Sequence, residues 1–287
     1  MSFSSSLINW YNSNKRDLPW RRTTDPYKIW LSEIILQQTR VNQGLPYYNS
    51  FVKSFPTIFD LADASEDKVF KLWQGLGYYS RARNLHFTSK YICVNFDGKF
   101  PDNFNEIILL KGIGVYTASA ICSFAFKGRY AVVDGNVYRV LSRFFGIETP
   151  INSTKGIKEF KALATELIDK REPATFNQAI MEFGAQQCKP KKPYCIICPL
   201  QSGCIAFLKN QTSGLPVKLK KIKIRHRYFN YLVIIDQHKK TIIEQRTEKG
   251  IWQNLYQFPL IESKESIAVY EFEKEISKHK LIKNLKF

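Results

Sequence analysis

The stretch LLKGIGVYTASA, residues 109–120, combines an apolar segment, a Gly-x-Gly turn and a run of small residues. This order predicts two helices joined by a tight hairpin, a helix–hairpin–helix pattern. Gly112 and Gly114 let the backbone approach a ligand closely, because neither carries a Cβ atom. The free amides at the start of the second helix would point at an anion such as a DNA phosphate. The competing interpretation is an ordinary helix–helix corner.

The charge of the chain supports a polyanionic partner. Among 287 residues, 43 are Lys or Arg and 25 are Asp or Glu, which gives a formal net charge of +18. Nucleic acid is the first candidate partner and an anionic membrane surface the second. No apolar run approaches the roughly 18 residues of a membrane span, and the first residues lack the pattern of a signal peptide. We expect a cytoplasmic, bacterial-type monomer that works on the nucleoid without membrane association.

Apolar residues recur near a 3.6-residue period along most of the chain up to residue 208. The segments expected to be helical are 6–14, 27–40, 45–55, 66–76, 80–96, 103–110, 117–126, 137–147, 157–170 and 176–188. We therefore expect a mainly α fold with a helical domain over 1–208. A basic linker is expected over 209–227. Beyond it, residues 228–236 and 241–246 predict a β-hairpin within a small module over 228–287.

Four cysteines lie in one short run with the spacing Cys188-x6-Cys195-x2-Cys198-x5-Cys204. Disulfides seldom persist in the cytosol. Structural zinc sites usually pair two close-spaced knuckles, whereas this run has one knuckle and no His. An iron–sulfur cluster accepts four thiolates from a compact loop, because its irons spread the attachment points. The spacing favours a cluster and leaves zinc open.

Three lysines lie between the first two of these cysteines, at Lys189, Lys191 and Lys192. Held out between two ligands, they would suit contact with phosphate groups. A merely solvated charged loop is the alternative.

Two carboxyl groups are placed for acid–base chemistry. Glu33 has Ile29 four residues before it and Leu36 three after it, so it lies on or beside the apolar face of its helix. Such a group is either paired or has a raised pKa, and the second case suits a general acid. Asp134 lies between an apolar run and a helix start, where an ordinary N-cap is the alternative. One protonated and one ionised carboxyl are what cleavage through an oxocarbenium-like state requires.

Several stretches, in family order across residues 10–208, resemble the MutY-type adenine DNA glycosylases of the endonuclease III, or helix–hairpin–helix, superfamily. They are LPWR, PYKIWLSEIILQQTRV, LWQGLGYYSRARNL, LKGIGVYTASAI, VVDGNVYRVLSR, FNQAIMEFGAQQC and the cysteine run. The resemblance implies two helical lobes, one a six-helix barrel and the other holding a [4Fe-4S] cluster on the four cysteines, with double-stranded DNA between them.

The implied reaction is removal of adenine mispaired with 8-oxoguanine or guanine, after the adenine has flipped out of the duplex. Glu33 matches the acid that protonates adenine, and Asp134 matches the stabiliser of the oxocarbenium ion. The other positions that match functional residues of the family are Tyr116 and Asn136 around the sugar, Arg16, Trp20, Arg21 and Glu182 in the adenine pocket, and Gln38 and Tyr78 inside the duplex.

Three departures refine this expectation. Tyr116 stands where strand-cutting relatives carry a Lys that forms a Schiff base, so a monofunctional glycosylase is expected. Lys111 stands where the hairpin of the family usually has Pro. The module over 228–287 resembles the start of a Nudix-like domain without a Nudix box, and the chain ends before the loop expected to contact 8-oxoguanine. Either the form is truncated or discrimination depends on the catalytic domain.

Three alternatives remain. A bifunctional pyrimidine-lesion glycosylase is disfavoured by Tyr116. A non-catalytic iron–sulfur protein that binds damaged DNA is disfavoured by the presence of both Glu33 and Asp134. A zinc-stabilised helical binding module predicts a colourless protein.

Overall fold

The computed structural model describes residues 2–219, 226–268 and 276, and the chain forms two compact units, Met1–Lys220 and Lys221–Phe287. The helices of the first unit are α1 (Phe3–Asn14), η1 (Pro19–Arg21), α2 (Pro26–Leu36), α3 (Val41–Ser54), α4 (Ile58–Asp63), α5 (Glu66–Trp73), α6 (Ser80–Phe96), α7 (Phe104–Ile107), α8 (Val115–Phe126), α9 (Gly135–Phe145), α10 (Thr154–Leu167), α11 (Pro173–Gln186), η2 (Gln201–Gly203) and α12 (Ile205–Leu208). Among the described residues, none of these helices is long and apolar enough to cross a bilayer.

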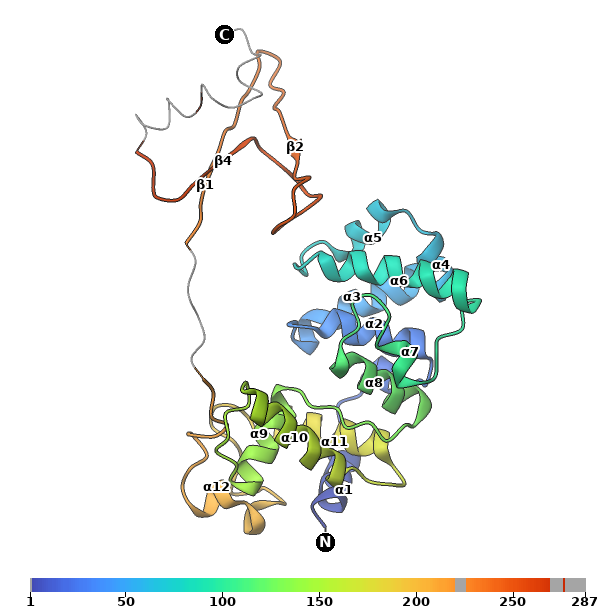
Figure 1. Ribbon diagram of the computed structural model, residues 1–287, viewed down its shortest axis with the longest axis vertical. Helices are drawn as coiled ribbons and strands as arrows, with labels where there is room; N and C mark the ends of the chain where they lie inside the picture. The colour runs from blue at the N-terminus through green and yellow to red at the C-terminus, as the bar shows by residue number, and fades with distance from the viewer. Residues whose placement is uncertain (1, 220–225, 269–275, 277–287) are drawn as a thin grey trace. The chain divides into compact units, whose positions relative to one another are not determined.

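Two hydrophobic cores divide the helical unit into two lobes (Figure 1). The first core is built mainly from α2 to α8 and contains the fully buried Trp30 and Trp73. The second is built from α1 and α9 to α11 and contains the fully buried Phe160 and Phe176. Helix α1 packs on α11, which brings the N-terminal segment into the second lobe. The mainly helical, two-lobed expectation is confirmed.

Helix α2 begins as the sequence predicts and ends earlier. Asp25 is its N-cap and accepts a hydrogen bond from the Tyr27 amide at 2.9 Å, and Pro26 occupies the first turn. The helix ends at Leu36, so the predicted extension to Arg40 is wrong and residues 37–40 form a loop that begins with a turn at 37–38. This early end places Gln38 on a loop, where its φ is 56°.

The Gly-x-Gly hairpin joins α7 to α8 and is fastened to α6. Gly112 has a φ of 83°, and a Cβ atom there would lie 2.7 Å from the Cβ atom of Asn84. The Thr88 hydroxyl donates a hydrogen bond of 2.8 Å to the Lys111 carbonyl. Gly114 is the N-cap of α8, and a Cβ there would meet no atom within 4 Å. The start of α8 therefore has free space beside Gly114, as a phosphate-binding hairpin requires.

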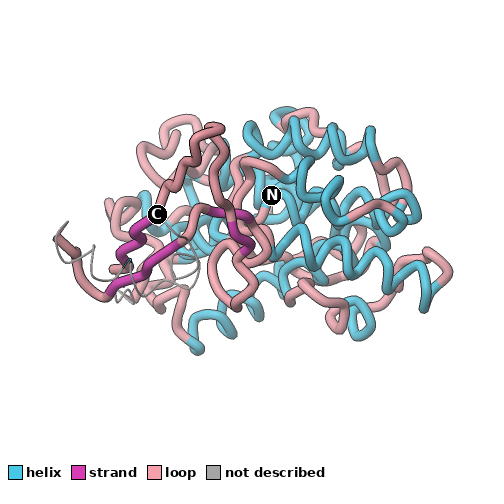
Figure 2. Tube along the Cα trace, turned by 90° about the horizontal axis from the view of Figure 1, so that it is seen from above, coloured by secondary structure: helices cyan, strands magenta, loops and turns pink. Residues whose placement is uncertain are grey.

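The described residues of the second unit form two small antiparallel sheets, drawn in magenta in Figure 2. Strand β1 (Tyr228–Tyr231) pairs with β4 (Leu260–Ser263), and β2 (Glu244–Gln245) pairs with β3 (Tyr256–Gln257). The predicted turn is present, closed by a bridge between Ile235 and Thr241. The predicted hairpin pairing of 228–236 with 241–246 is otherwise wrong. A local pattern identifies strands, whereas β1 takes its partner from a distant segment.

Part of the predicted linker packs on the helical unit. The Ile151 amide donates to the Val217 carbonyl at 3.0 Å, and Arg143 Nε donates to the Leu215 carbonyl at 3.1 Å. These contacts hold the segment up to Leu219, where two hydrogen bonds join Asn152 to its backbone. Residues 220–225 of the predicted linker, and residues 269–275 and 277–287 of the predicted Nudix-like module, lie outside the described residues.

Candidate active site

A cavity of about 640 Å³ is lined by residues of both lobes. This volume lies within the range of about 300–1,000 Å³ that is typical of small-molecule sites. The predicted site residues in its lining are Arg16, Trp20, Arg21, Glu33, Gln38, Tyr116, Asp134, Asn136 and Glu182. Tyr78 is not in this lining and lies on the loop between α5 and α6 with 66% of its surface exposed. The fold thus gathers positions that are far apart in the sequence into one site.

Glu33 occupies the penultimate turn of α2 with its side chain buried, as its spacing from Ile29 and Leu36 predicts. Burial raises the pKa of Glu33 to about 7, helped by the negative charge of Asp134. The Tyr116 hydroxyl, which donates a hydrogen bond to the carboxyl, and the Arg21 charge act in the opposite direction. A carboxyl with this pKa holds a proton at neutral pH in about half of the molecules, which suits a general acid.

Tyr116 lies in the first turn of α8, directly after the hairpin. Burial, and then the charges of Glu33 and Asp134, raise the pKa of its hydroxyl well above the ordinary value. The phenol therefore stays protonated and acts as a hydrogen-bond donor toward Glu33.

Asp134 is the N-cap of α9, so the alternative interpretation of this residue as a helix cap is confirmed. Its Oδ1 accepts hydrogen bonds from the amides of Asn136 and Val137, both at 2.8 Å, and its Oδ2 accepts one from Asn136 Nδ2 at 2.7 Å. Burial raises the pKa of Asp134, whereas these three donors favour the carboxylate. Capping and lining the cavity are compatible roles, because the cap fixes where the carboxylate points.

The segment that leads to Asp134 is held by two side chains that the sequence did not single out. Asn177 is buried on α11, accepts a hydrogen bond from the Val132 amide at 3.0 Å and donates one to the Tyr130 carbonyl at 2.9 Å. Lys161 on α10 donates to the Ala131 carbonyl at 2.5 Å. The residues that Asn177 and Lys161 contact lie far from them in the sequence, so no local pattern indicates these contacts.

Glu182 on α11 is the centre of a buried charged cluster. Its carboxylate accepts two hydrogen bonds of 2.7 Å from the Arg16 side chain and one of 2.7 Å from Arg21 Nη2. Burial opposes ionisation, yet these partners hold the pKa of Glu182 at about 2. Gln178 accepts from Arg21 Nε at 2.9 Å, and Gln186 donates to Glu182 at 2.6 Å. No pattern in the sequence pointed to these two glutamines, although each lies one helical turn from Glu182.

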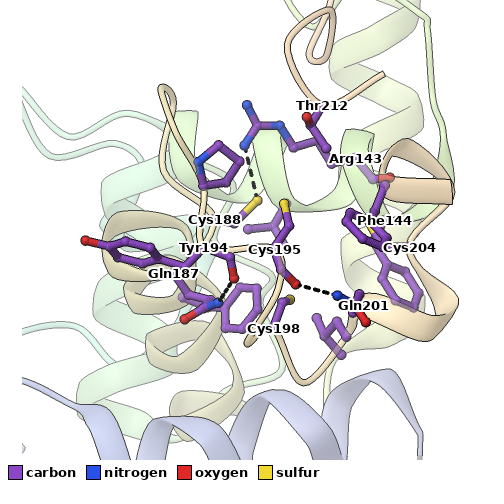
Figure 3. A pocket seen from close by; sticks show the side chains of 15 residues that line it. Arg143, Phe144, Gln187, Cys188, Tyr194, Cys195, Cys198, Gln201, Cys204 and Thr212 are labelled. Atoms are coloured by element: carbon purple, nitrogen blue, oxygen red, sulfur yellow. Dashed lines mark hydrogen bonds between the residues drawn. The ribbon is translucent and has the colours of Figure 1, made fainter. Parts of the chain in front are cut away.

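The four cysteines line a single pocket in the second lobe, shown in Figure 3. Burial, and then the negative charge that the other three groups carry as thiolates, raises the pKa of Cys198 to about 11. Arg143 Nη1 donates to the Cys188 sulfur at 3.4 Å. Among the described residues, no three His, Cys, Asp or Glu side chains are grouped so that they could hold one metal ion.

The lysines of the cysteine loop differ from one another. Lys191 and Lys192 are exposed, as expected. Lys189 is not held out, because its ammonium group donates to the Tyr194 hydroxyl at 2.9 Å and lies 4.2 Å from the centre of that ring. The contact with phosphate stays a prediction for all three lysines, and Lys189 is the one whose ammonium group already has a partner.

Comparison with known proteins decides the family. The HhH-GPD superfamily of base excision DNA repair proteins matches residues 31–168. An adenine DNA glycosylase of Buchnera aphidicola subsp. Acyrthosiphon pisum is 38% identical over 96% of this chain and 79% of its own length. The adenine DNA glycosylase of Buchnera aphidicola subsp. Schizaphis graminum is 40% identical over 91% of this chain and 76% of its own.

This chain belongs to the adenine DNA glycosylase family. Membership makes it an enzyme of base excision repair that hydrolyses a glycosidic bond. Among solved structures, the structure of a thermostable thymine-DNA glycosylase superposes on this chain with a TM-score of 0.67 and 31% identity. The match covers 72% of this chain and 95% of the other. The helix–hairpin–helix fold expected from the sequence is confirmed.

Proposed function

We propose that the protein excises adenine mispaired with 8-oxoguanine or guanine in double-stranded DNA. The observation that carries the proposal is a buried Glu33 with a pKa of about 7 that shares one cavity with Asp134. The net charge of +18 and the open amide end of α8 at Gly114 support a DNA partner. Two relatives that are 38–40% identical are named adenine DNA glycosylase, which supports adenine as the released base.

In the proposed reaction, Glu33 donates its proton to a ring nitrogen of the flipped adenine. The glycosidic bond then breaks with its electron pair moving to the base, and the Asp134 carboxylate stabilises the oxocarbenium ion. Water adds to C1′ and returns a proton to Glu33. Tyr116 donates its hydrogen bond toward the acid throughout, and Asn136 fixes Asp134 through the contact between Nδ2 and Oδ2.

Binding of the base and the duplex is assigned to the remaining predicted residues. The cluster of Arg16, Arg21 and Glu182, beside Trp20, would form the adenine pocket, since its polar groups are fixed in advance. Gln38 and Tyr78 would enter the duplex. Backbone phosphates would lie on Gly112, Gly114, Lys189, Lys191 and Lys192.

The cavity also supports a monofunctional reaction. Among the described residues, no lysine lines it, and Tyr116, which does line it, stands at the sequence position where strand-cutting relatives carry their lysine. A phenol cannot form an imine. Water is therefore the nucleophile that we propose.

A [4Fe-4S] cluster fits the cysteine pocket. The thiols of Cys188, Cys195, Cys198 and Cys204 line one pocket without forming a single-ion group, and a cluster offers four separate attachment points. These thiolates would hold the cluster, which would fix the loop that carries the exposed lysines.

The native protein is expected to be brown, with broad absorption near about 400 nm, as thiolate-bound iron–sulfur clusters are. Cys198→Ser should lower that absorption and reduce affinity for undamaged duplex as well, because the lysine loop loses its anchor. Cys93→Ser, which changes a cysteine outside the pocket, is the matched control. Stoichiometric zinc in a colourless native protein would refute the cluster.

Single-turnover base release tests the proposed activity. Adenine should be released when opposite 8-oxoguanine or guanine and retained when opposite thymine, and the strand should stay intact until alkali is added. A further duplex carries thymine opposite guanine, because a thymine-DNA glycosylase is a structural relative. Release of thymine alone would overturn the substrate, and trapping of a covalent DNA adduct by borohydride would overturn the monofunctional chemistry.

A further inference from the structure

One guanidinium group holds the ends of two loops. Arg81, on α6, directs Nη1 toward the end of α2, where it donates to the carbonyl oxygens of Ile34, Ile35 and Gln37 at 3.0, 3.0 and 2.6 Å. The carbonyls at a helix end lack partners within the helix, and a cation there is favourable. Arg81 therefore closes α2 at the point where the Gln38 loop begins.

The other branch of the same guanidinium reaches the loop between α5 and α6. Nη2 donates to the carbonyl oxygens of Leu76 and Gly77, both at 3.2 Å. The guanidinium carbon also lies 5.0 Å from the centre of the Trp73 ring. Residues that are far apart in sequence are thus joined through one rigid, planar group.

Each of the two loops contains one residue with a strained backbone conformation. Gln38 has a φ of 56° and Tyr78 a φ of 47°, a conformation that non-glycine residues seldom adopt. Both side chains are exposed. Arg81 binds the carbonyl directly before each of them, at Gln37 and Gly77.

We propose that Arg81 is a positioning residue that sets the separation and direction of Gln38 and Tyr78, so that both side chains enter the duplex together. The inference rests on the proposed function, in which these two residues open the stack. Lys would keep the charge at the end of α2, but its ammonium is a single point and cannot span both loops. Arg81→Lys therefore separates positioning from charge.

The test compares two substrates. One duplex pairs the target adenine with 8-oxoguanine, and the other places it opposite an abasic site, where the stack is already opened. Arg81→Lys should slow release from the paired duplex by about a hundredfold, as expected for misplaced substrate-positioning groups, and leave the opened duplex near the native rate. Equal loss on both duplexes would mean that Arg81 only supports the fold, and would overturn the proposal.

Arg83→Lys is the matched control, because it lies on the same helix and its guanidinium is 3.8 Å from Glu66 and stacks on Phe70. It should leave both rates unchanged. In a Gln38→Ala, Tyr78→Ala background, Arg81→Lys should cause no further loss on the paired duplex, since its partners are gone. An additive loss would contradict the inference.

Native-state hydrogen exchange gives a readout that needs neither activity nor a substitution. In the native protein, the amides of Thr39 and Leu76, which are hydrogen-bonded to the Leu36 and Trp73 carbonyls, should open with the same free energy, because one group joins the two loops. Independent opening would overturn the role of Arg81 even if Arg81→Lys did not fold. If the native protein released no adenine from any duplex, the proposed function would fail, and the exchange result alone would decide the role of Arg81.

Discussion

Glu33→Gln is expected to lower the single-turnover rate of adenine release by about a hundredfold to ten-thousandfold, the usual contribution of a general acid. Glutamine keeps the shape of the side chain and can still accept the hydrogen bond from the Tyr116 hydroxyl. It cannot give up a proton to adenine. The loss should therefore appear in the chemical step, measured with enzyme in excess, while affinity for the mispaired duplex stays close to native.

The pH profile makes this assignment specific. In the proposed reaction the active form of Glu33 is protonated, and its pKa is about 7, so base release should fall about tenfold per pH unit as the pH rises above that value. The decrease in rate at high pH can be assigned to Glu33 only if it is absent in Glu33→Gln, whose slow residual rate should not change with pH. A native rate that keeps rising with pH would contradict the assignment.

Glu166→Gln is the matched control for this experiment. Glu166 is an exposed carboxyl on α10 outside the cavity lining, so the substitution makes the same exchange of a carboxyl for an amide away from the site. Native activity in this variant would show that the effect at Glu33 depends on its place in the cavity.

Glu33 and Asp134 could be recognised as candidate site residues from the sequence alone, because the residues around each in the chain indicate its environment. Three or four residues on either side place Glu33 on an apolar helix face, and the run before Asp134 meets a helix start. The four cysteines are recognisable from their spacing for the same reason. These features depend on neighbours in the chain, and the fold then adds burial and proximity.

The residues that hold the site in place could not be found in this way. Arg81, Asn177 and Lys161 act through backbone carbonyls or amides of distant segments, and such partners leave no trace in side-chain patterns. The same reason explains the early end of α2, which Arg81 closes from another helix. It also explains the pairing of β1 with β4 in place of the nearer strand.

Asp134→Asn is expected to slow adenine release by about a thousandfold, because removing a preorganised charge from a reacting centre costs about that much. Asn is as good an N-cap as Asp, so α9 should still start at Gly135. Its amide nitrogen would, however, replace the Oδ2 that accepts from Asn136 Nδ2, leaving two donors face to face. Single-turnover rates and thermal unfolding measure the two effects separately.

Asp25→Asn is the matched control for Asp134→Asn. Asp25 is the N-cap of α2 and lies outside the cavity lining, so the substitution again exchanges a capping carboxylate for an amide. Asp134→Asn should melt at a somewhat lower temperature than Asp25→Asn, because only it brings two donors face to face, and only Asp134→Asn should release adenine slowly. A native rate in Asp134→Asn would leave Asp134 a helix cap and nothing more. Slow release together with intact duplex binding and a small change in melting temperature would assign the effect to its negative charge at the developing cation.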